Sequence, residues 1–211
     1  MIVPVSLCRT GSALYRSLWG YKSPWVDSPT RRSARIGIAS VLARFLDHHG
    51  SCIATAARGQ WDLVTCVASS RPRLGPHPLA QILASVPQAL GGEFREILRA
   101  RPVPSPAAAA AAAPAAGGVL GHNRARDDGF EVTYAVAGRR VLILDDSFTT
   151  GARAHSAASA LALAGADVVA VVPVGRVVRP EFATFAHRLW LRQEAQTFTF
   201  ARCCLEPDEP A

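Results

Sequence analysis

The chain has 211 residues, of which 49% are hydrophobic and 18% are charged. This composition is too apolar for a wholly disordered protein, and the length suits one sizeable α/β domain, whereas two full domains would be tight. No stretch approaches the roughly 20 apolar residues needed to span a bilayer. The apolar run at residues 2–7 also lacks the charged start and cleavage region of a secretory signal, so we expect a cytoplasmic protein without a membrane partner.

The formal net charge of the chain is +7, and the excess of positive charge lies in the first half. Residues 1–105 hold 13 basic and 5 acidic side chains, a balance of +8, whereas residues 106–211 hold 10 and 11, a balance of −1. Lys22 is the sole lysine, so nearly all of the positive charge is guanidinium, which binds phosphate oxygens in a bidentate fork. A phosphorylated substrate, pyrophosphate or a nucleic acid would each be attracted to this half. The alternative is an arginine-rich composition without a binding role.

The first predicted elements are a helix and a buried strand. Apolar residues recur at helical spacing in residues 35–49, and Gly50 is expected to end this helix. Residues 61–68 are apolar with β-branched side chains at the centre, which predicts a buried strand. Three prolines then interrupt regular structure until a second predicted helix at residues 79–90, which Pro87 is expected to kink or end.

Residues 101–118 form a low-complexity stretch of alanine and proline that ends in two glycines. We expect either a passive linker or a loop that closes over a site, within a chain that otherwise forms a single domain over residues 1–211. Residues 130–136 then alternate like a strand, and a glycine suggests a tight turn into a second strand at residues 141–144. Together these two strands predict a hairpin.

A strand, a loop, a helix and another strand follow one another in the last third of the chain. The strand 141–144 precedes an alanine-rich helix at residues 154–164 and the all-apolar strand 168–174. Such an apolar run is typical of a strand inside a parallel sheet. The order predicts a βαβ unit with a right-handed parallel crossover. We expect a further helix at residues 180–192 and a short edge strand at residues 197–201.

The sequence V-L-I-L-D-D-S-F-T-T-G-A-R at residues 141–153 carries the most specific chemistry. In open α/β sheets, ligands gather beyond the carboxyl ends of the strands, and this segment leaves such a strand and enters a helix. Ser147, Thr149, Thr150 and Gly151 therefore bring hydroxyls and backbone amides to one point, an arrangement that binds anions. Gly151 also lets the backbone approach a phosphate closely, because it has no β-carbon.

The two carboxylates in this segment indicate a sugar in addition to a phosphate. Asp145 and Asp146 would repel a bare phosphate, whereas ribose hydroxyls are natural partners for them. The two side chains point to opposite sides if the strand geometry continues, so adjacent sugar hydroxyls or the ligand shell of Mg²⁺ are the expected contacts. A phosphorylated sugar accounts for both halves of the segment. The alternative is an ordinary strand-to-helix turn with capping Asp and Thr side chains.

The segment resembles the phosphoribosyl pyrophosphate motif of the type I phosphoribosyltransferases, in which apolar residues precede D-D-x-x-T-T-G and a final Thr or Ser. Within that superfamily the chain looks like the ComF-type proteins over segments 14–22, 62–73 and 123–130. The resemblance implies an α/β fold with an open, mainly parallel sheet flanked by helices. It also implies transfer of the phosphoribosyl group from phosphoribosyl pyrophosphate, with release of pyrophosphate and help from Mg²⁺. The alternative is a non-catalytic ribose-phosphate or nucleic-acid binding protein on the same fold.

The resemblance also implies roles for individual residues. Asp145 and Asp146 would be catalytic residues that hold the ribose and favour positive charge on its ring. Ser70 and Arg71 would belong to a pyrophosphate loop. The implied substrate-binding residues are Ser147, Thr149, Thr150, Gly151, Ala152, Arg153, Ser70 and Arg71. The acceptor of the phosphoribosyl group stays open.

The sequence departs from the family pattern in three places. The family's N-terminal zinc ribbon is missing, because the five cysteines include no C-x-x-C pair and are expected to be free thiols. Arg153 replaces the last hydroxyl of the motif, and would either bind the 5-phosphate or point outward to solvent. The Arg-Gly-Phe-Asn element of the family is replaced by the four residues Leu74, Gly75, Pro76 and His77.

Overall fold

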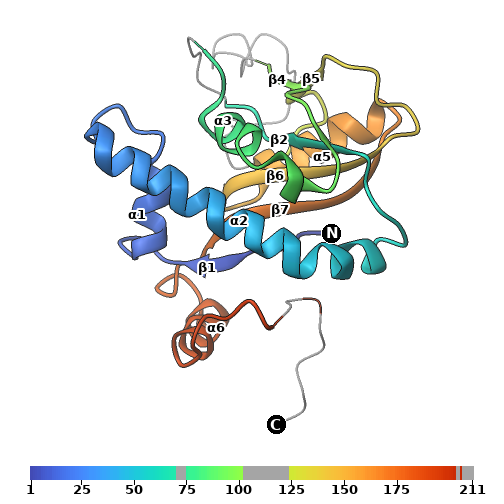
Figure 1. Cartoon of the computed structure of the whole chain (residues 1–211). Coiled ribbons are helices and arrows are strands. Elements are labelled where there is room, and N and C mark those ends of the chain that lie inside the picture. Colours follow the sequence, from blue (N-terminus) through green and yellow to red (C-terminus); the bar gives the residue numbers. More distant parts are fainter. Residues whose placement is uncertain (70–74, 102–123, 203–204, 206–211) are drawn as a thin grey trace, which may run out of the picture.

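The computed structural model describes residues 1–69, 75–101, 124–202 and 205. Its centre is a five-stranded sheet in which every neighbouring pair of strands is parallel. Helices flank this sheet (Figure 1), so the predicted α/β class with an open parallel sheet is confirmed. In spatial order, the strands are β1 (Ser6–Cys8), β7 (Asp167–Val177), β6 (Arg140–Phe148), β2 (Leu63–Cys66) and β3 (Glu93–Phe94).

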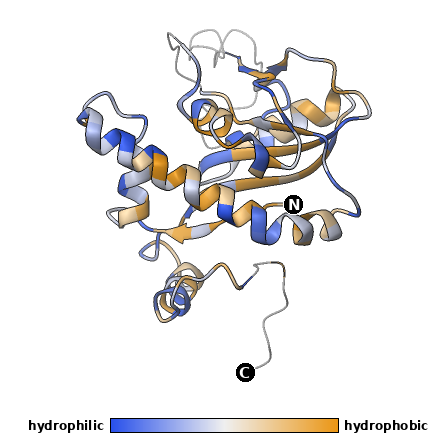
Figure 2. Cartoon of the chain, in the orientation of Figure 1, coloured by the Kyte–Doolittle hydropathy of each residue, from blue (hydrophilic) through white to orange (hydrophobic). Residues whose placement is uncertain are grey.

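Helices cover both faces of the sheet, because the side chains of β6 alternate between two apolar cores. Leu142 and Leu144 face the core that contains α1, α2 and α3, whereas Val141 and Ile143 face the core that contains α5. Figure 1 shows α2 across one face of the sheet, and Figure 2 shows the central strands to be mainly hydrophobic. The four helices are α1 (Ala13–Gly20), α2 (Ser28–Ala56), α3 (Pro78–Ala84) and α5 (Ala152–Leu163).

The predicted βαβ unit is confirmed, since β6, α5 and β7 follow one another and the two strands pair in parallel. After α5 the chain turns at Gly165, whose φ of 87° lies in the left-handed region that glycine adopts without steric cost. The turn brings the Asp167 N–H to the carbonyl of Arg139, at 2.9 Å, where β7 begins. The unit therefore forms from local sequence signals that agree with one another.

The connections after β2 and β6 run in opposite directions. β2 is followed by α3, the 3-10 helix η1 (Pro87–Leu90) and then β3 on one side, whereas β6 is followed by α5 and then β7 on the other side. α3 lies on the same face as α2, and α5 lies on the opposite face. A divergence of this kind leaves a crevice at the carboxyl ends of the two strands, where open α/β proteins bind ligands.

The predicted hairpin is wrong. β5 (Phe130–Val132) pairs antiparallel with β4 (Leu98–Ala100) in a separate two-stranded sheet. The turn before β6 is present, since the N–H of Arg139 donates to the carbonyl of Val136, but both edges of β6 are occupied by β2 and β7. An alternating pattern identifies a strand without identifying its partner. The stretch 101–118, predicted as a linker or loop, lies outside the described residues except for its first position.

The helix predicted at residues 35–49 is longer in both directions, and the prediction that Gly50 ends it is wrong. α2 continues for six residues beyond this glycine, and there Ile53 and Ala54 are buried in the core. Their burial offsets the cost of a glycine inside a helix, which is about 1 kcal/mol. The helix predicted at residues 79–90 is divided: α3 ends at Ala84, and Pro87 begins the separate 3-10 helix η1, so the predicted interruption near this proline is confirmed. None of the helices in the described ranges combines the length and apolar character needed to cross a membrane.

The two ends of the described chain agree with the prediction only in part. The run 2–7 lies along β7 at the sheet edge, where the N–H of Val3 donates to the carbonyl of Val171 at 2.9 Å, and it leads into β1. Near the other end, α6 (Thr184–Glu194) confirms the last predicted helix. The edge strand predicted at residues 197–201 is absent from this described segment. Its Phe200 ring instead stacks on His48 of α2, at 5.9 Å between ring centres, so side-chain packing replaces strand pairing there.

Candidate functional site

A pocket of about 430 Å³ lies at the carboxyl ends of β2 and β6. Its lining comes from the end of α1 and the following loop, the residues after β2, the start of α3, and the end of β6 with the first turn of α5. Two tryptophans, Trp19 and Trp25, stand among otherwise mainly polar residues. The polar lining residues are Lys22, Ser23, Ser69, His77, Asp145, Asp146, Ser147 and Arg153. The pocket thus occupies the crevice that the diverging connections create.

The turn after β6 requires glycine and presents two hydroxyls. β6 continues to Phe148, so the strand geometry predicted for the two aspartates is confirmed. Gly151 is the N-cap of α5 with φ of 78°, and a β-carbon there would overlap the ring of Phe148. Thr149 and Thr150 are exposed, and Oγ1 of Thr150 accepts the N–H of Ala152 at 3.4 Å. These residues follow the pocket lining directly but do not line the pocket themselves.

The buried carboxylate of Asp146 is engaged on both oxygens. Its Oδ2 accepts the hydroxyl of Tyr21 at 2.5 Å and the ammonium of Lys22 at 2.6 Å, and its Oδ1 accepts the hydroxyl of Ser147 at 2.8 Å. Burial by itself would raise the pKa of Asp146, but the Lys22 charge and these hydrogen bonds outweigh burial and lower it below 3.8. Asp146 is therefore a fixed negative charge at neutral pH.

Asp145 is half-buried and differs from its neighbour in protonation. Alternation along β6 places it on the α5 side, and its Oδ1 accepts the backbone N–H of Asp146 at 2.9 Å. Burial first, and the charge of Asp146 second, raise the pKa of Asp145 to about 8, against the weaker opposite effects of Lys22 and Arg153. One carboxyl of the pair thus stays mainly protonated at neutral pH and can donate as well as accept a hydrogen bond.

The guanidinium of Arg153 turns back from α5 toward the end of β2. Its Nη2 donates to the carbonyl of Ala68, and its Cζ lies 5.5 Å from the centre of the Phe130 ring. Because the side chain is half-buried and lines the pocket, the alternative that Arg153 points outward to solvent is wrong. Burial lowers the pKa of Arg153, while Asp145 and Asp146 act in the opposite direction, and a guanidinium stays charged at neutral pH.

The predicted pyrophosphate loop is described only at its start. Ser70 and Arg71 lie outside the described residues, whereas Ala68 and Ser69, directly before them, line the pocket. His77, which stands where the sequence departs from the family's element, lines the pocket as well. Its Nδ1 caps the first turn of α3 by accepting a backbone N–H at 3.3 Å. The histidine therefore has a structural role in addition to its position at the site.

Sequence reasoning assigned no role to four residues around the pocket. Tyr21 and Lys22 bind Asp146, although they precede it by 125 and 124 positions in the chain. Trp19 and Trp25 are 53% and 88% exposed, which is unusual for tryptophan. Both residues line the pocket. Trp19, Tyr21 and Lys22 lie in the segment 14–22 that resembles the ComF-type proteins, but the resemblance gave them no role, and nothing in their spacing connects them to the motif.

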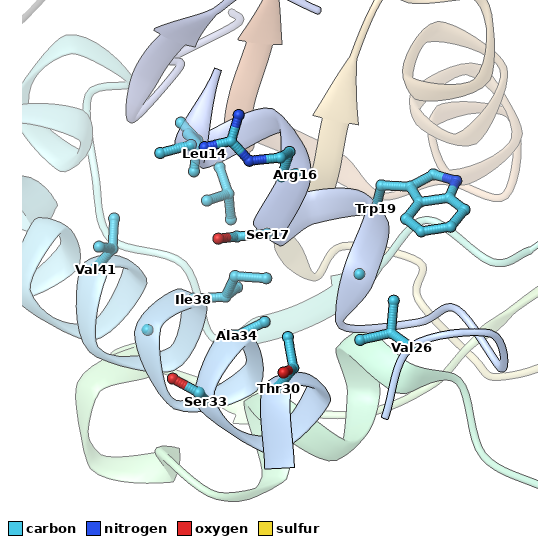
Figure 3. A pocket seen from close by; sticks show the side chains of 14 residues that line it. Leu14, Arg16, Ser17, Trp19, Val26, Thr30, Ser33, Ala34, Ile38 and Val41 are labelled. Carbon is cyan, nitrogen blue, oxygen red and sulfur yellow. The ribbon is translucent and has the colours of Figure 1, made fainter. Parts of the chain in front are cut away.

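A second and larger pocket, of about 860 Å³, lies between α1 and α2. Figure 3 shows Leu14 of α1 facing Ile38 and Val41 of α2 across it. Its lining is mainly apolar, with Arg16 as the only charged lining residue among those the structure describes. Trp19 lines both pockets, so the two cavities are neighbours.

Side chains that bind metal ions do not gather in the described part of the chain. There, no three His, Cys, Asp or Glu side chains lie together in a way that could hold a metal ion. The three described cysteines, Cys8, Cys52 and Cys66, are free, as predicted. Burial raises the pKa of Cys8 to about 11 and also raises that of Cys66, so neither thiol is reactive at neutral pH.

The chain is thus an α/β protein with an open parallel sheet and a polar pocket at the point where the connections after β2 and β6 diverge. No protein-family model matches the chain. No curated protein is significantly similar to it in sequence. A function therefore has to be argued from the motif and from the residues that surround the pocket.

Proposed function

We propose that this protein binds phosphoribosyl pyrophosphate at the strand-end pocket and transfers the phosphoribosyl group to an acceptor, with release of pyrophosphate. The observation that carries the proposal is the position of the D-D-x-x-T-T-G motif, which ends the strand that borders a polar pocket at the divergence of the connections. The pocket, at about 430 Å³, is within the size range of small-ligand sites. Carboxylates, hydroxyls and cations thus gather where the fold favours a ligand.

The 5-phosphate would bind at the turn 149–151. The first turn of α5 has backbone N–H groups without intrahelical acceptors, and the helix dipole favours an anion there. Gly151 lets the backbone approach a phosphate, and the exposed hydroxyls of Thr149 and Thr150 add donors. Arg153 supplies a positive charge in the same turn. This arrangement supports a phosphate subsite beside the pocket.

The ribose and the reacting carbon would lie over the end of β6. A nucleophile attacks C1, the bond from C1 to the pyrophosphate oxygen breaks, and its electron pair leaves with pyrophosphate. The fixed charge of Asp146 would favour positive character on the ring in the transition state. Asp145, which keeps a proton at neutral pH, can hydrogen-bond a sugar hydroxyl as donor or acceptor. The two aspartates would therefore act differently on the sugar.

Mg²⁺ would bind mainly through the ligand. This ion keeps several water molecules and is usually held by one or two carboxylates together with substrate phosphates. Asp146 is already engaged on both oxygens, which leaves Asp145 as the carboxylate that could add a bond, and it would have to release its proton to do so, because metal ligands bind in the deprotonated form. The residues present fit that mode of binding. Mg²⁺ would neutralise charge on the leaving pyrophosphate.

The test is a calorimetric titration of the protein with phosphoribosyl pyrophosphate and Mg²⁺. We expect saturable binding by the parent and its loss in Thr150→Leu, since a bulky apolar side chain removes a hydroxyl and obstructs the turn. Ser159→Ala, on the exposed part of α5, serves as a matched control that should bind like the parent. Binding of equal strength by Thr150→Leu would show that the phosphate subsite is misplaced.

A second candidate is a non-catalytic ribose-phosphate or nucleic-acid binding protein. The excess of basic residues in the first half of the chain favours it. Several of these arginines, however, bind within the protein: Arg35 donates to the carbonyl of Tyr21 at 3.2 Å and Arg31 to the carbonyl of Ser23 at 3.3 Å. Titration with single-stranded DNA at several salt concentrations separates the candidates, because several phosphate contacts give a steep salt dependence. Steep dependence without release of pyrophosphate favours the second candidate.

A further inference from the structure

Lys22 is the only lysine of the chain, and it lines the strand-end pocket. Its Nζ donates to Oδ2 of Asp146 at 2.6 Å, while 30% of its side chain is exposed. An ammonium group has three hydrogens. Within the described part of the chain, Asp146 is the only hydrogen-bond acceptor of Lys22, so two hydrogens remain for an acceptor in the pocket.

The backbone that carries Lys22 is held from three directions. The preceding residue, Tyr21, is fully buried, and its hydroxyl donates to Asp146 at 2.5 Å. Its carbonyl accepts Nε of Arg35 from α2 at 3.2 Å, and its N–H donates to the carbonyl of Ser17 at 3.0 Å. Lys22 is therefore positioned before any ligand arrives, so little side-chain entropy is lost on binding.

Asp146 does not depend on Lys22 alone, because Tyr21 and Ser147 also donate to its carboxylate. A partly exposed ion pair contributes little to stability by itself. Lys22 reaches the pocket from the α1 side, whereas Arg153 reaches it from the α5 side. The pocket thus receives one cation from each face of the sheet, which suits a ligand with two anionic groups.

We infer that Lys22 is a ligand-binding residue whose ammonium group contacts a phosphate or pyrophosphate oxygen while it stays bonded to Asp146. Tyr21 and Asp146 are then positioning residues for that ammonium group. The contact lies on the α1 side of the pocket and leaves the turn 149–151 for the 5-phosphate. This inference rests on the proposed ligand class and adds the residue that binds the second anionic group.

The first test compares Lys22→Met with Lys22→Arg by calorimetry, using phosphoribosyl pyrophosphate and, separately, inorganic pyrophosphate, each with Mg²⁺. Methionine keeps the chain length and removes the charge, so we expect binding to weaken by about tenfold or more, the usual effect of losing a charge-assisted hydrogen bond. Arginine keeps the charge and should restore most of the affinity. Equal binding by the parent and Lys22→Met overturns this inference and leaves the proposed function standing. A parent that binds neither probe overturns both.

The second test uses the parent protein and needs no variant. Because Lys22 is the only lysine, an amine-acetylating reagent meets only two amines in the chain, that of Lys22 and the N-terminal one, and peptide mass mapping reports the two separately. Saturating phosphoribosyl pyrophosphate with Mg²⁺ should slow acetylation of Lys22 by about tenfold or more while the rate at the N-terminal amine stays the same, since a bound phosphate covers the free ammonium hydrogens. Unchanged acetylation of Lys22 under conditions of proven binding overturns the inference.

Discussion

The two pockets that share Trp19 in their lining differ in size and in chemistry. The pocket between α1 and α2 is about twice as large, at about 860 Å³ against about 430 Å³, but its lining is mainly apolar. The smaller pocket collects two aspartates, a lysine, an arginine and a histidine from four separate segments. The volume of a pocket follows from how helices pack, whereas the convergence of polar groups follows from the direction of the strands and their connections.

The largest expected effect concerns Asp146, the centre of the polar pocket's network. Asp146→Asn removes the charge that Lys22 binds, and we expect a loss of about 2–3 kcal/mol in the free energy of unfolding. For a chain of this size that loss lowers Tm by about 5–10 °C. The comparison variant is Ser17→Ala in the apolar pocket, which should change stability by less than about 0.5 kcal/mol. Equal, small effects at both positions would remove the distinction between the two pockets.

The loss of stability in Asp146→Asn should depend on pH in a definite direction. The pKa of Asp146 is lowered below 3.8 in the folded protein, so the ionised form is favoured by folding. Its contribution is complete above the ordinary pKa and is lost as the pH falls through the folded value. Thermal unfolding of the parent and Asp146→Asn should therefore differ fully at pH 6 and converge as the pH falls below about 4. A constant difference over this range would contradict the assignment of the ion pair.

The next largest effect concerns the turn beside the polar pocket. Gly151→Ala meets two costs, a φ of 78° and overlap with the ring of Phe148. Gly138→Ala, at the other end of β6, meets only the first cost, with φ of 73° and open space around the new β-carbon. We expect about 1 kcal/mol for Gly138→Ala and at least twice that for Gly151→Ala.

Chemical denaturation measures both variants, and calorimetry measures their binding of phosphoribosyl pyrophosphate. Gly151→Ala should also lose binding, because displacement of Phe148 disturbs the turn that presents Thr149 and Thr150. Gly138→Ala should bind like the parent. If the two variants lose the same free energy of unfolding, Phe148 does not constrain the turn.

A smaller effect concerns Asp145, whose pKa is raised to about 8 by burial and by the charge of Asp146. The protonated form is favoured by folding, so its contribution is present below the ordinary value of 3.8 and is lost as the pH rises through about 8. Asparagine resembles the neutral carboxyl. We expect Asp145→Asn to unfold like the parent at pH 4 and to be more stable by at least about 1 kcal/mol at pH 8, with weaker ligand binding. A stability difference that does not grow with pH would contradict the raised pKa.

The smallest effect should come from the apolar pocket. Gly37 lies within α2 and lines that pocket, and a β-carbon added to it would have no atom within 4 Å. Gly37→Ala should stabilise the protein by about 0.5–1 kcal/mol, since alanine favours a helix over glycine. Binding of phosphoribosyl pyrophosphate should not change. A loss of binding in this variant would show that the larger pocket belongs to the ligand site.

Much of the fold around the motif could be predicted, because each part carries its own local signal. The apolar run of β6, the small residues of α5, and the apolar run of β7 each indicate one element, and their order predicts a parallel unit. The wrong predictions concern the partner of a strand and the end of a helix. The pattern of β5 identified a strand but not its pairing with β4. Gly50 suggested the end of a helix, but α2 continues to Ala56 because Ile53 is buried in the core.

The candidate site divides in the same way. From the sequence alone came the aspartate pair, the hydroxyls at Thr149 and Thr150, and the need for glycine at position 151, since all are neighbours in one strand-to-turn segment. Only the tertiary structure showed that Tyr21 and Lys22 bind Asp146, and that burial and the charge of Asp146 raise the pKa of Asp145. The spacing of residues along a chain determines local geometry. The contact between Lys22 and Asp146, 124 positions apart, arises only because α1 packs against the sheet and its C-terminal end lies near the end of β6.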